Sequence, residues 1–406
     1  MSELAASRQS VTCCIVGGGP AGMMLGFLLA RAGVAVAVLE KHGDFFRDFR
    51  GDTIHPSTLE VMHELGVLDA FLQRPHQEAH EIGGIIGTEP VVMADFRHLP
   101  THCKFVAFMP QWDFLDFIAQ QARRHAGFRL MMNADAVDLV VRGDRITGVV
   151  ARTPGGMVEI AADLVVAADG RHSTVRDKAG MHVEERGAPM DVLWLRLSRR
   201  ASDAGAALGR VARGAIFVTI DRGDYWQCGF VIPKGSFDER RRRGIEALRA
   251  EIAALVPQFA DRVGELRAWD DVKLLTVAID LLPRWHRPGL LLIGDAAHAM
   301  SPIGGVGINL AVQDAIAAAN ILAAPLREGA LTERDLASVQ RRREWPTRMT
   351  QRLQLFLQKR FVGRVLAAQD NVHVPLVVRL IQVFPWLRRI PARAIGMGFR
   401  PEHVRH

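Results

Sequence analysis

The chain has 406 residues, a length that indicates more than one lobe. Of these residues 49% are hydrophobic and 23% charged, which is typical of a folded protein. Its apolar runs are shorter than the roughly 20 residues that a membrane-spanning helix needs, and its N-terminus lacks the features of a signal peptide. The four cysteines have no metal or redox spacing, and the adjacent Cys13 and Cys14 should point to opposite faces of a strand. We therefore expect reduced structural thiols in a cytoplasmic protein.

The net charge of +7 is unevenly distributed along the chain. Residues 341–406 carry 14 Arg or Lys and 3 acidic residues, so the preceding part is slightly acidic. No aromatic and basic nucleic-acid module accompanies this charge, and we expect no nucleic-acid partner. A solvated helical face is the favoured interpretation. Peripheral contact with an anionic membrane stays open, because the apolar residues 374–387 adjoin the arginines.

The first predicted elements form a βαβ unit. Residues 11–16 and 34–39 have the pattern of buried strands, and the segment between them has helical spacing up to Gly33. Strand, glycine turn, helix and strand within about 30 residues begin a parallel sheet. Residues 112–125 predict an amphipathic helix, and the short alternating runs of 129–168 predict an antiparallel meander that returns to the main sheet.

The second half of the chain alternates between strands and helices. Strands are expected within 183–233, a charged helix at 238–256, a buried strand at 289–293 and an Ala-rich helix at 307–325. The remainder should be helical, with breaks at Pro346, Pro375, Pro385 and Pro391. This order predicts three parts: a nucleotide-binding lobe (1–75, 101–182 and 272–345), a sheet-rich lobe inserted in it (76–100 and 183–271) and a helical C-terminal segment (346–406).

A glycine-rich motif lies between the first strand and the first helix. Gly17 permits the tight turn, Gly19 lets the backbone approach a pyrophosphate, and Gly22 lets the helix pack on the strand. The helix N-terminus then presents free N–H groups to phosphates. Glu40 ends the second strand, 18 residues after Gly22, where a carboxylate can accept ribose hydroxyls. These residues, with the neighbouring Ala21 and Lys41, are predicted to bind a dinucleotide.

Two later segments also follow buried strands. Asp169 begins the segment DGRHSTVR, and a helix N-cap is the simple alternative for this carboxylate. Asp295 begins a second segment and can hydrogen-bond a ribityl or ribose hydroxyl. A glycine-rich turn with Gly305 and Gly307 follows it. The N–H groups of Ile308 and Asn309 at the next helix start would face an anionic ring edge, which is what reduced flavin presents.

Together GGGPAG, DGRHSTVR and GDAAHAMSPIGGVGINLAVQD resemble the three signatures of the class A flavoprotein monooxygenases, the p-hydroxybenzoate hydroxylase-like family. The resemblance implies an α/β fold: a Rossmann-like FAD-binding lobe of the GR2 type, an inserted mixed β-sheet substrate lobe and a helical C-terminal end. It also implies bound FAD, with NADH or NADPH as a transient co-substrate that has no second Rossmann site.

The resemblance further assigns individual residues to the cofactor. It places Arg50 and Gln111 near FAD, Asp169 near the pyrophosphate and Asp295 on the ribityl chain. Pro302 would lie beside the flavin carbon that accepts oxygen. The implied reaction uses NAD(P)H and O2 to hydroxylate a small apolar molecule, aromatic or otherwise lipophilic, through a C4a-hydroperoxyflavin. The rival interpretations are a flavin reductase or dehydrogenase without oxygen insertion and a non-catalytic FAD-binding protein, and the oligomeric state stays open between monomer and homodimer.

The predicted substrate lobe departs from the type enzyme, which activates phenols with tyrosines. This chain has one tyrosine, Tyr225, which is a candidate acid-base group, although packing is the commoner role of a strand tyrosine. Trp194, Arg196, Trp226 and Gln227 are further pocket candidates, with packing again as the default.

Two histidine pairs have the helical i, i+4 spacing of metal ligands. They are His76 with His80 and His98 with His102, but Pro100 interrupts the second pair and no third ligand is evident. We therefore expect no metal.

Overall fold

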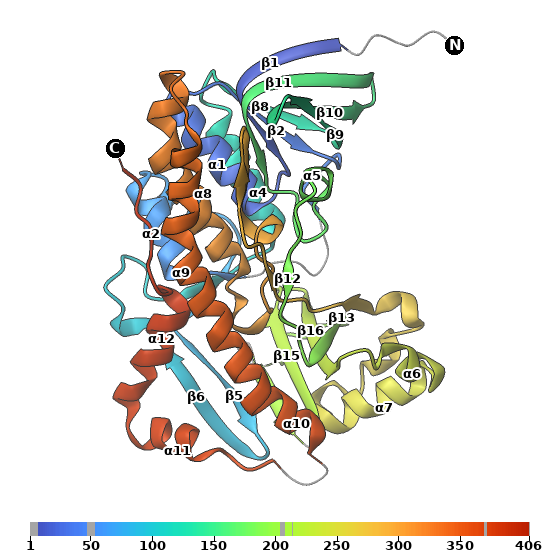
Figure 1. Ribbon diagram of the computed structural model, residues 1–406. Helices are drawn as coiled ribbons and strands as arrows, with labels where there is room; N and C mark the ends of the chain where they lie inside the picture. The colour runs from blue at the N-terminus through green and yellow to red at the C-terminus, as the bar shows by residue number, and fades with distance from the viewer. Residues whose placement is uncertain (1–6, 47–52, 204–207, 213, 369–371, 406) are drawn as a thin grey trace.

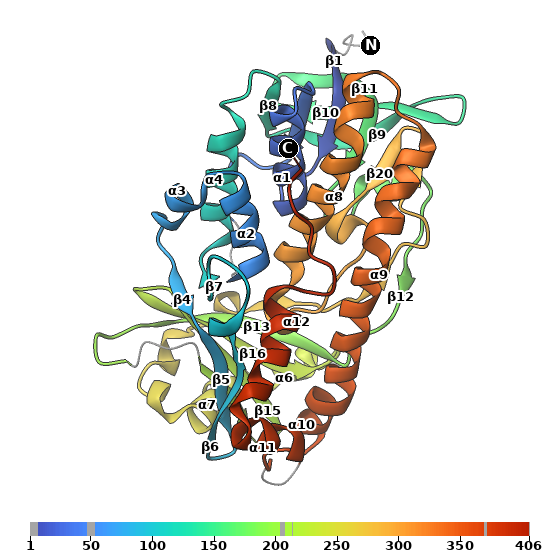
Figure 2. The same cartoon turned by 90° about the vertical axis from the view of Figure 1, so that its left-hand side faces the viewer.

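The computed structural model describes residues 7–46, 53–203, 208–212, 214–368 and 372–405. A largely parallel sheet lies at one end of the molecule and a second sheet at the other (Figure 1). Two long helices, α8 (Gly307–Arg327) and α9 (Glu333–Leu357), connect the two ends along one side (Figures 1 and 2).

The first sheet has eight strands, with β19, β20, β11, β1, β2 and β8 side by side and β10 and β9 added at β11. The pairs from β20 to β8 are parallel. Cys13 and Cys14 pack into separate clusters on the two faces of the sheet, and all four cysteines are buried and free, as predicted. The strands are β1 (Ser7–Val16), β2 (Val36–Glu40), β8 (Phe128–Met132), β9 (Asp135–Arg142), β10 (Arg145–Thr153), β11 (Gly156–Ala167), β19 (His286–Arg287) and β20 (Leu290–Leu292).

The predicted meander over 129–168 was wrong in two respects. Its first run, β8, pairs parallel with β2, because helix α4 (Gln111–Ala122) carries the chain to the sheet as a crossover. Its last two runs are one strand, β11, whose first half pairs antiparallel with β10 and which pairs parallel with β1 from Val158 to Ala167.

The second sheet has seven strands in the order β17, β13, β16, β15, β14, β5 and β6. One face packs against α7, and the predicted helix over 238–256 is two helices, because Gly244 has a φ of +85° between α6 and α7. The strands and these helices are β5 (Glu81–Ile86), β6 (Glu89–Asp95), β13 (Met190–Ser198), β14 (Leu208–Ala212), β15 (Ala215–Asp221), β16 (Tyr225–Pro233), β17 (Lys273–Leu275), α6 (Phe237–Arg242) and α7 (Ile245–Leu255).

Helix α9 continues through Pro346, so the predicted break there was wrong. A proline removes one backbone hydrogen bond. Packing of the buried face of α9, from Leu336 to Gln354, offsets that loss. The segment Ile303–Arg327, which contains α8, is long and apolar enough to cross a membrane by composition, but 72% of its apolar window is buried inside the protein. We therefore interpret α8 as a core helix.

The C-terminal elements follow α9 and lie against the β5–β6 hairpin at the end of the molecule away from β1 (Figures 1 and 2). Gln382 joins the two parts, because its side chain bonds both the N–H and the carbonyl of Val92. These elements are the π-helical turn η7 (Gln358–Val362), α10 (Gly363–Ala367), α11 (Leu376–Val383), η8 (Pro385–Arg388) and α12 (Arg389–Gly396). The remaining ones are α1 (Pro20–Arg31), α2 (Pro56–Glu64), α3 (Leu68–Leu72), α5 (Thr174–Lys178), a small sheet of β3 (Thr53–Ile54), β4 (Gln77–Ala79) and β7 (Val106–Phe108), and the pair β12 (Glu184–Glu185) and β18 (Asp280–Leu281).

Candidate active site

A cavity of about 1900 Å³ extends from the carboxyl ends of the first sheet to the face of the second sheet opposite α7. The carboxyl ends of parallel strands are where ligands bind in open α/β sheets. Of the residues predicted to bind the cofactor, Gly17, Gly19, Ala21, Glu40, Lys41, Gln111, Asp169, Asp295, Gly305, Gly307 and Ile308 line this cavity. Arg50 lies outside the described residues.

The glycine motif has three different local geometries. A Cβ at Gly17 would lie 2.3 Å from Ala168 O, and one at Gly22 would lie 2.0 Å from Gly17 O. A Cβ at Gly19 would meet no described atom within 4 Å. Gly17 and Gly22 therefore serve the close approach of helix α1 to the sheet, whereas Gly19 leaves open space in the cavity at the uncapped start of α1.

Glu40 holds the glycine turn at the end of β2. Its Oε2 accepts a hydrogen bond from Gly18 N, and its Oε1 accepts one from His42 N, each at 3.0 Å. These bonds place the Glu40 carboxylate beside the glycine turn, and Glu40 lines the cavity.

The hydrogen bonds of the Asp169 carboxylate show whether these residues fit a dinucleotide. Its Oδ2 accepts a hydrogen bond from Val175 N at 3.2 Å, but its Oδ1 is buried without a hydrogen-bond partner in the described chain. Burial raises the pKa of this carboxyl above its ordinary value. A buried acceptor that lines the cavity fits a hydrogen-bonding group of a bound dinucleotide, because an unsatisfied buried group is destabilising.

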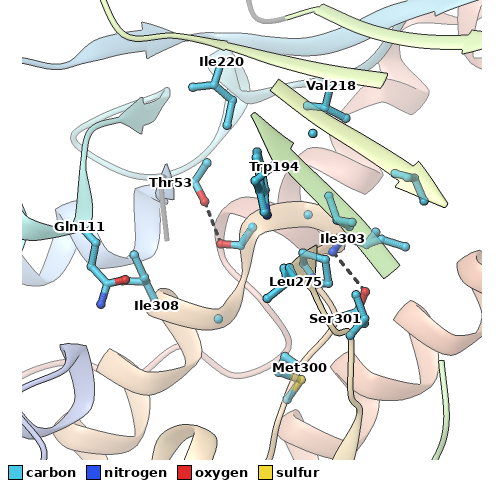
Figure 3. Close-up of a pocket in the computed structure, with 18 of the residues that line it drawn as sticks. Thr53, Gln111, Trp194, Val218, Ile220, Leu275, Met300, Ser301, Ile303 and Ile308 are labelled. Atoms are coloured by element: carbon cyan, nitrogen blue, oxygen red, sulfur yellow. Dashed lines mark hydrogen bonds between the residues drawn. The ribbon is translucent and has the colours of Figure 1, made fainter. Parts of the chain in front are cut away.

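The second glycine-rich turn is fastened to neighbouring elements. Thr53 Oγ1 donates a hydrogen bond to Gly305 O at 2.8 Å (Figure 3). Asn309 does not line the cavity, and its Oδ1 accepts hydrogen bonds from His55 N at 2.9 Å and Thr58 Oγ1 at 2.7 Å. Its side chain therefore joins α2 to the start of α8. Helix α8 begins at Gly307 without a side-chain cap, and Gly307 and the next residue line the cavity.

Sequence reasoning missed a row of buried glutamines on α9 and η7. Gln354 donates to the carbonyls of Ser301 (3.0 Å) and Ile303 (2.9 Å), and it accepts from Ser301 N. Gln351 donates to Ala299 O at 3.1 Å. These bonds hold the backbone around Pro302, which lines the cavity. Amide residues at 351, 354 and 358 recur at helical spacing, which is the signal that the sequence offered.

A second buried network lies behind Asp295. Asp314 Oδ2 is 2.6 Å from His298 Nε2 and accepts from Gly294 N at 3.0 Å, while Arg343 Nε donates to Asp314 Oδ1 at 3.0 Å. Burial raises the pKa of Asp314, but His298 and Arg343 outweigh that effect and leave it below its ordinary value. An ionised Asp314 therefore joins the turn that carries Asp295 to α8 and α9.

The substrate side of the cavity is an apolar wall from the second sheet. Trp194, Val218 and Ile220 line it, with Val192, Val231 and Leu275 beside them. Figure 3 shows Trp194, Val218 and Ile220 above Ile303 and Met300. Successive residues of a strand alternate between the cavity and the α7 side, and the positions of β15 that face the cavity are the apolar Ile216, Val218 and Ile220.

Four of the five pocket candidates in this sheet do not line the cavity, which corrects their prediction. Trp226 pairs with Leu197 and packs on the α7 side, where its Nε1 donates to Asp203 at 2.9 Å. Gln227 Oε1 accepts from Arg222 Nε at 3.2 Å, and the Arg196 guanidinium lies 4.7 Å from the centre of the Tyr225 ring. Gln227, Arg196 and Tyr225 lie near one end of the paired strands β13 and β16, beyond the wall. The alternation of residues along a strand predicts which face a side chain lies on, but not how far along the strand the cavity extends.

Metal ligands do not gather anywhere in the described ranges of the chain: no three His, Cys, Asp or Glu side chains lie close enough to share an ion. His102 Nδ1 instead lies 2.9 Å from Glu60 Oε1, and His80 Nδ1 lies 3.2 Å from Lys104 O.

Comparisons with known proteins agree with this site. The FAD binding domain family matches residues 10–353. The chain is 35% identical over 384 residues to the 6-methylpretetramide 4-monooxygenase of Streptomyces rimosus, which covers 93% of this chain and 91% of that relative. Other curated relatives are longer, and the chain spans 61–66% of five of them.

Two solved structures show the same fold. The anhydrotetracycline hydroxylase OxyS from Streptomyces rimosus has a TM-score of 0.74 at 23% identity, covering 96% of this chain and 76% of that one. The p-nitrophenol 4-monooxygenase PnpA from Pseudomonas putida DLL-E4 has a TM-score of 0.74 at 22% identity, covering 97% and 100%. The chain therefore belongs to the FAD binding domain family and is an FAD-dependent monooxygenase, as the three motifs predicted.

Proposed function

We propose that this enzyme hydroxylates a fused-ring aromatic molecule, with NADH or NADPH as the electron donor. The observation that carries the proposal is that the Pro302 turn and the uncapped start of α8 share one cavity with the apolar wall around Trp194. A flat, apolar substrate on that wall would lie between the second sheet and the flavin. The 6-methylpretetramide 4-monooxygenase, which matches over most of its length, supports a substrate with several rings.

In this proposal FAD binds the lobe formed by 1–75, 101–182 and 272–345, and the substrate packs on the lobe formed by 76–100 and 183–271. The Gly19 turn and the start of α1 would hold the pyrophosphate. Glu40 would bind the ribose and Asp295 the ribityl chain, with Lys41 and Gln111 near the cofactor. The N–H groups of Ile308 and Asn309 would stabilise negative charge on the flavin ring.

Bound FAD would supply hydride acceptance and oxygen activation, which no side chain provides. The protein itself would position the flavin and the substrate and would exclude water from the reacting atoms. Gln354 and Thr53 fix the turn from Ser301 to Gly305 through hydrogen bonds, so the flavin edge would meet a rigid backbone. The apolar wall would keep water from the reacting atoms, so that less activated oxygen is lost as hydrogen peroxide.

The test is to purify the enzyme with FAD and measure the consumption of NADH, NADPH and O2 with a panel of one-ring and fused-ring phenols. The proposal expects a fused-ring compound to stimulate both consumptions and to gain one oxygen atom by mass spectrometry. Stimulated NAD(P)H consumption without oxygen in the product would instead favour the reductase interpretation. Equal activity on one-ring phenols would contradict the fused-ring class.

A further inference from the structure

Large hydrophobic side chains are exposed together on the C-terminal elements. Seven of the fifteen exposed large hydrophobic residues in the described chain lie between residues 376 and 390, with exposed fractions of 43–73%. We call this set the C-terminal patch: Leu376, Val377, Leu380, Val383, Phe384, Trp386 and Ile390. Contiguous exposed apolar surface of this kind is typical of an interaction site.

The residues that fasten α11 to the protein lie outside the patch. Val378 is the buried residue of the helix, and Gln382 holds it to β6 through Val92. The opposite face of α11 carries Leu376, Leu380 and Val383 into solvent. An ordinary surface helix turns its apolar face inward, and α11 has most of that face outward. The structure therefore leaves these three side chains exposed.

The segment that carries the patch has charges of one sign. Residues 372–400 include five arginines and no acidic residue. Arg379, Arg389 and Arg393 are exposed, and the one acidic contact of these three in the described structure is Glu89, 3.9 Å from Arg379 Nη2. Exposed Leu, Val, Phe and Trp side chains bordered by arginines match the boundary between the acyl chains and anionic headgroups of a bilayer.

The cavity opens beside the patch. Val377 belongs to the patch and also lines the cavity, and Pro375, Phe356 and Leu357 line the cavity nearby. Phe356, at 58% exposed, continues the apolar surface on the α9 side. An apolar molecule could therefore pass from a bilayer to the wall around Trp194 along hydrophobic side chains.

We propose that the C-terminal patch docks on an anionic phospholipid bilayer and places the mouth of the cavity against it. This docking goes beyond the proposed function and does not depend on it, because binding is measured without turnover. A second copy of the chain is the less suitable occupant. A twofold contact through the patch would bring five arginines against five, and like charges across an interface are unfavourable.

The experiment is cosedimentation of the FAD-loaded enzyme with vesicles of phosphatidylcholine alone or with phosphatidylglycerol added. The wild type should pellet with the anionic vesicles and less so as salt rises, since salt screens the arginines. Val383→Ser with Trp386→Ala should lower the partition at least tenfold, because apolar burial is lost. The matched control is Val141→Ser with Met157→Ser, two exposed residues on β9 and β11 at the other end of the molecule (Figure 1).

Charge is tested separately from apolar burial. Arg389→Glu with Arg393→Glu should also lower binding at least tenfold, whereas Arg241→Glu with Arg242→Glu on α6 makes the same change in net charge and should bind like the wild type. Melting temperature and FAD content establish that each variant is folded. Absence of the wild type from anionic pellets, equal binding to both vesicle types, or a dimer in solution that the patch variants dissociate would each overturn the proposal.

Discussion

Gln358 Nε2 donates a hydrogen bond to Ser301 Oγ over 2.6 Å, and both side chains are buried. Ser301 Oγ in turn accepts from Ile303 N at 3.2 Å, so the π-helical turn η7 reaches the backbone on both sides of Pro302. Gln354 binds the same segment from α9. The turn that would face the flavin is thus held by a helix distant in sequence as well as by its own hydrogen bonds.

This arrangement predicts the effect of Gln354→Leu. The change leaves the N–H of Ser301 and the carbonyls of Ser301 and Ile303 without this partner, and each unsatisfied buried group is destabilising by about 1–3 kcal/mol. We expect a lower free energy of unfolding in urea and more hydrogen peroxide per NAD(P)H, because a looser turn admits water. Arg352→Leu, on the exposed side of α9, is the control. Unchanged stability and unchanged peroxide yield in Gln354→Leu would contradict the role of the glutamine row.

The parts of the site that the sequence predicted are local ones. Gly19, Asp169 and Asp295 each follow a strand directly, so strand position alone brings them to one sheet edge. The glutamine row could not be predicted, because α9 meets residues 299–303 only in the folded chain. The two alternatives for Trp226, pocket or packing, could not be separated from the sequence for a related reason. Its face of β16 is occupied by α7, and no pattern within the strand reveals which face a helix will cover.

Substitutions in the glycine motif should have two different effects, loss of FAD binding at Gly19 and loss of folding at Gly22. Gly19→Val should fold, since Gly19 has an extended backbone (φ −76°, ψ −175°) and open space around it, but the side chain would fill the pyrophosphate position. We expect loss of FAD with a folded apoprotein. Gly22→Val should instead disrupt folding, because its Cβ would meet Gly17 O at 2.0 Å. Flavin absorbance and circular dichroism distinguish the two, and full FAD occupancy in Gly19→Val would refute the phosphate assignment.

Replacing the two tryptophans of the second sheet should also have two different effects, one on substrate binding and one on stability. Trp194 lines the cavity, so Trp194→Ala should raise the KM for the aromatic substrate about tenfold or more, with a moderate loss of stability. Trp226 is 3% exposed in the packing against α7, and Trp226→Ala should lower the free energy of unfolding by about 3–5 kcal/mol. Steady-state kinetics and urea unfolding of both variants are the measurements. Equal effects of the two changes on KM would mean that the wall around Trp194 is not the substrate surface.

His55 predicts a pH dependence of stability. The ring is 1% exposed, its Nδ1 lies 2.7 Å from Ile395 O in α12, and burial lowers its pKa from 6.5 to about 4. Between these two values the unfolded chain binds a proton that the folded chain does not. The stability due to neutral His55 is therefore complete above about pH 6.5 and is lost as the pH falls toward 4.

From pH 7 to pH 5 this loss is about 2 kcal/mol. His55→Asn keeps an N–H donor near Ile395 O and removes the titration. Urea unfolding of the wild type and the variant at both pH values isolates the contribution of His55, because every other titrating group is shared. We expect the wild type to lose about 2 kcal/mol more than the variant on acidification. Parallel losses in the two proteins would show that His55 is not held neutral between α2, α8 and α12.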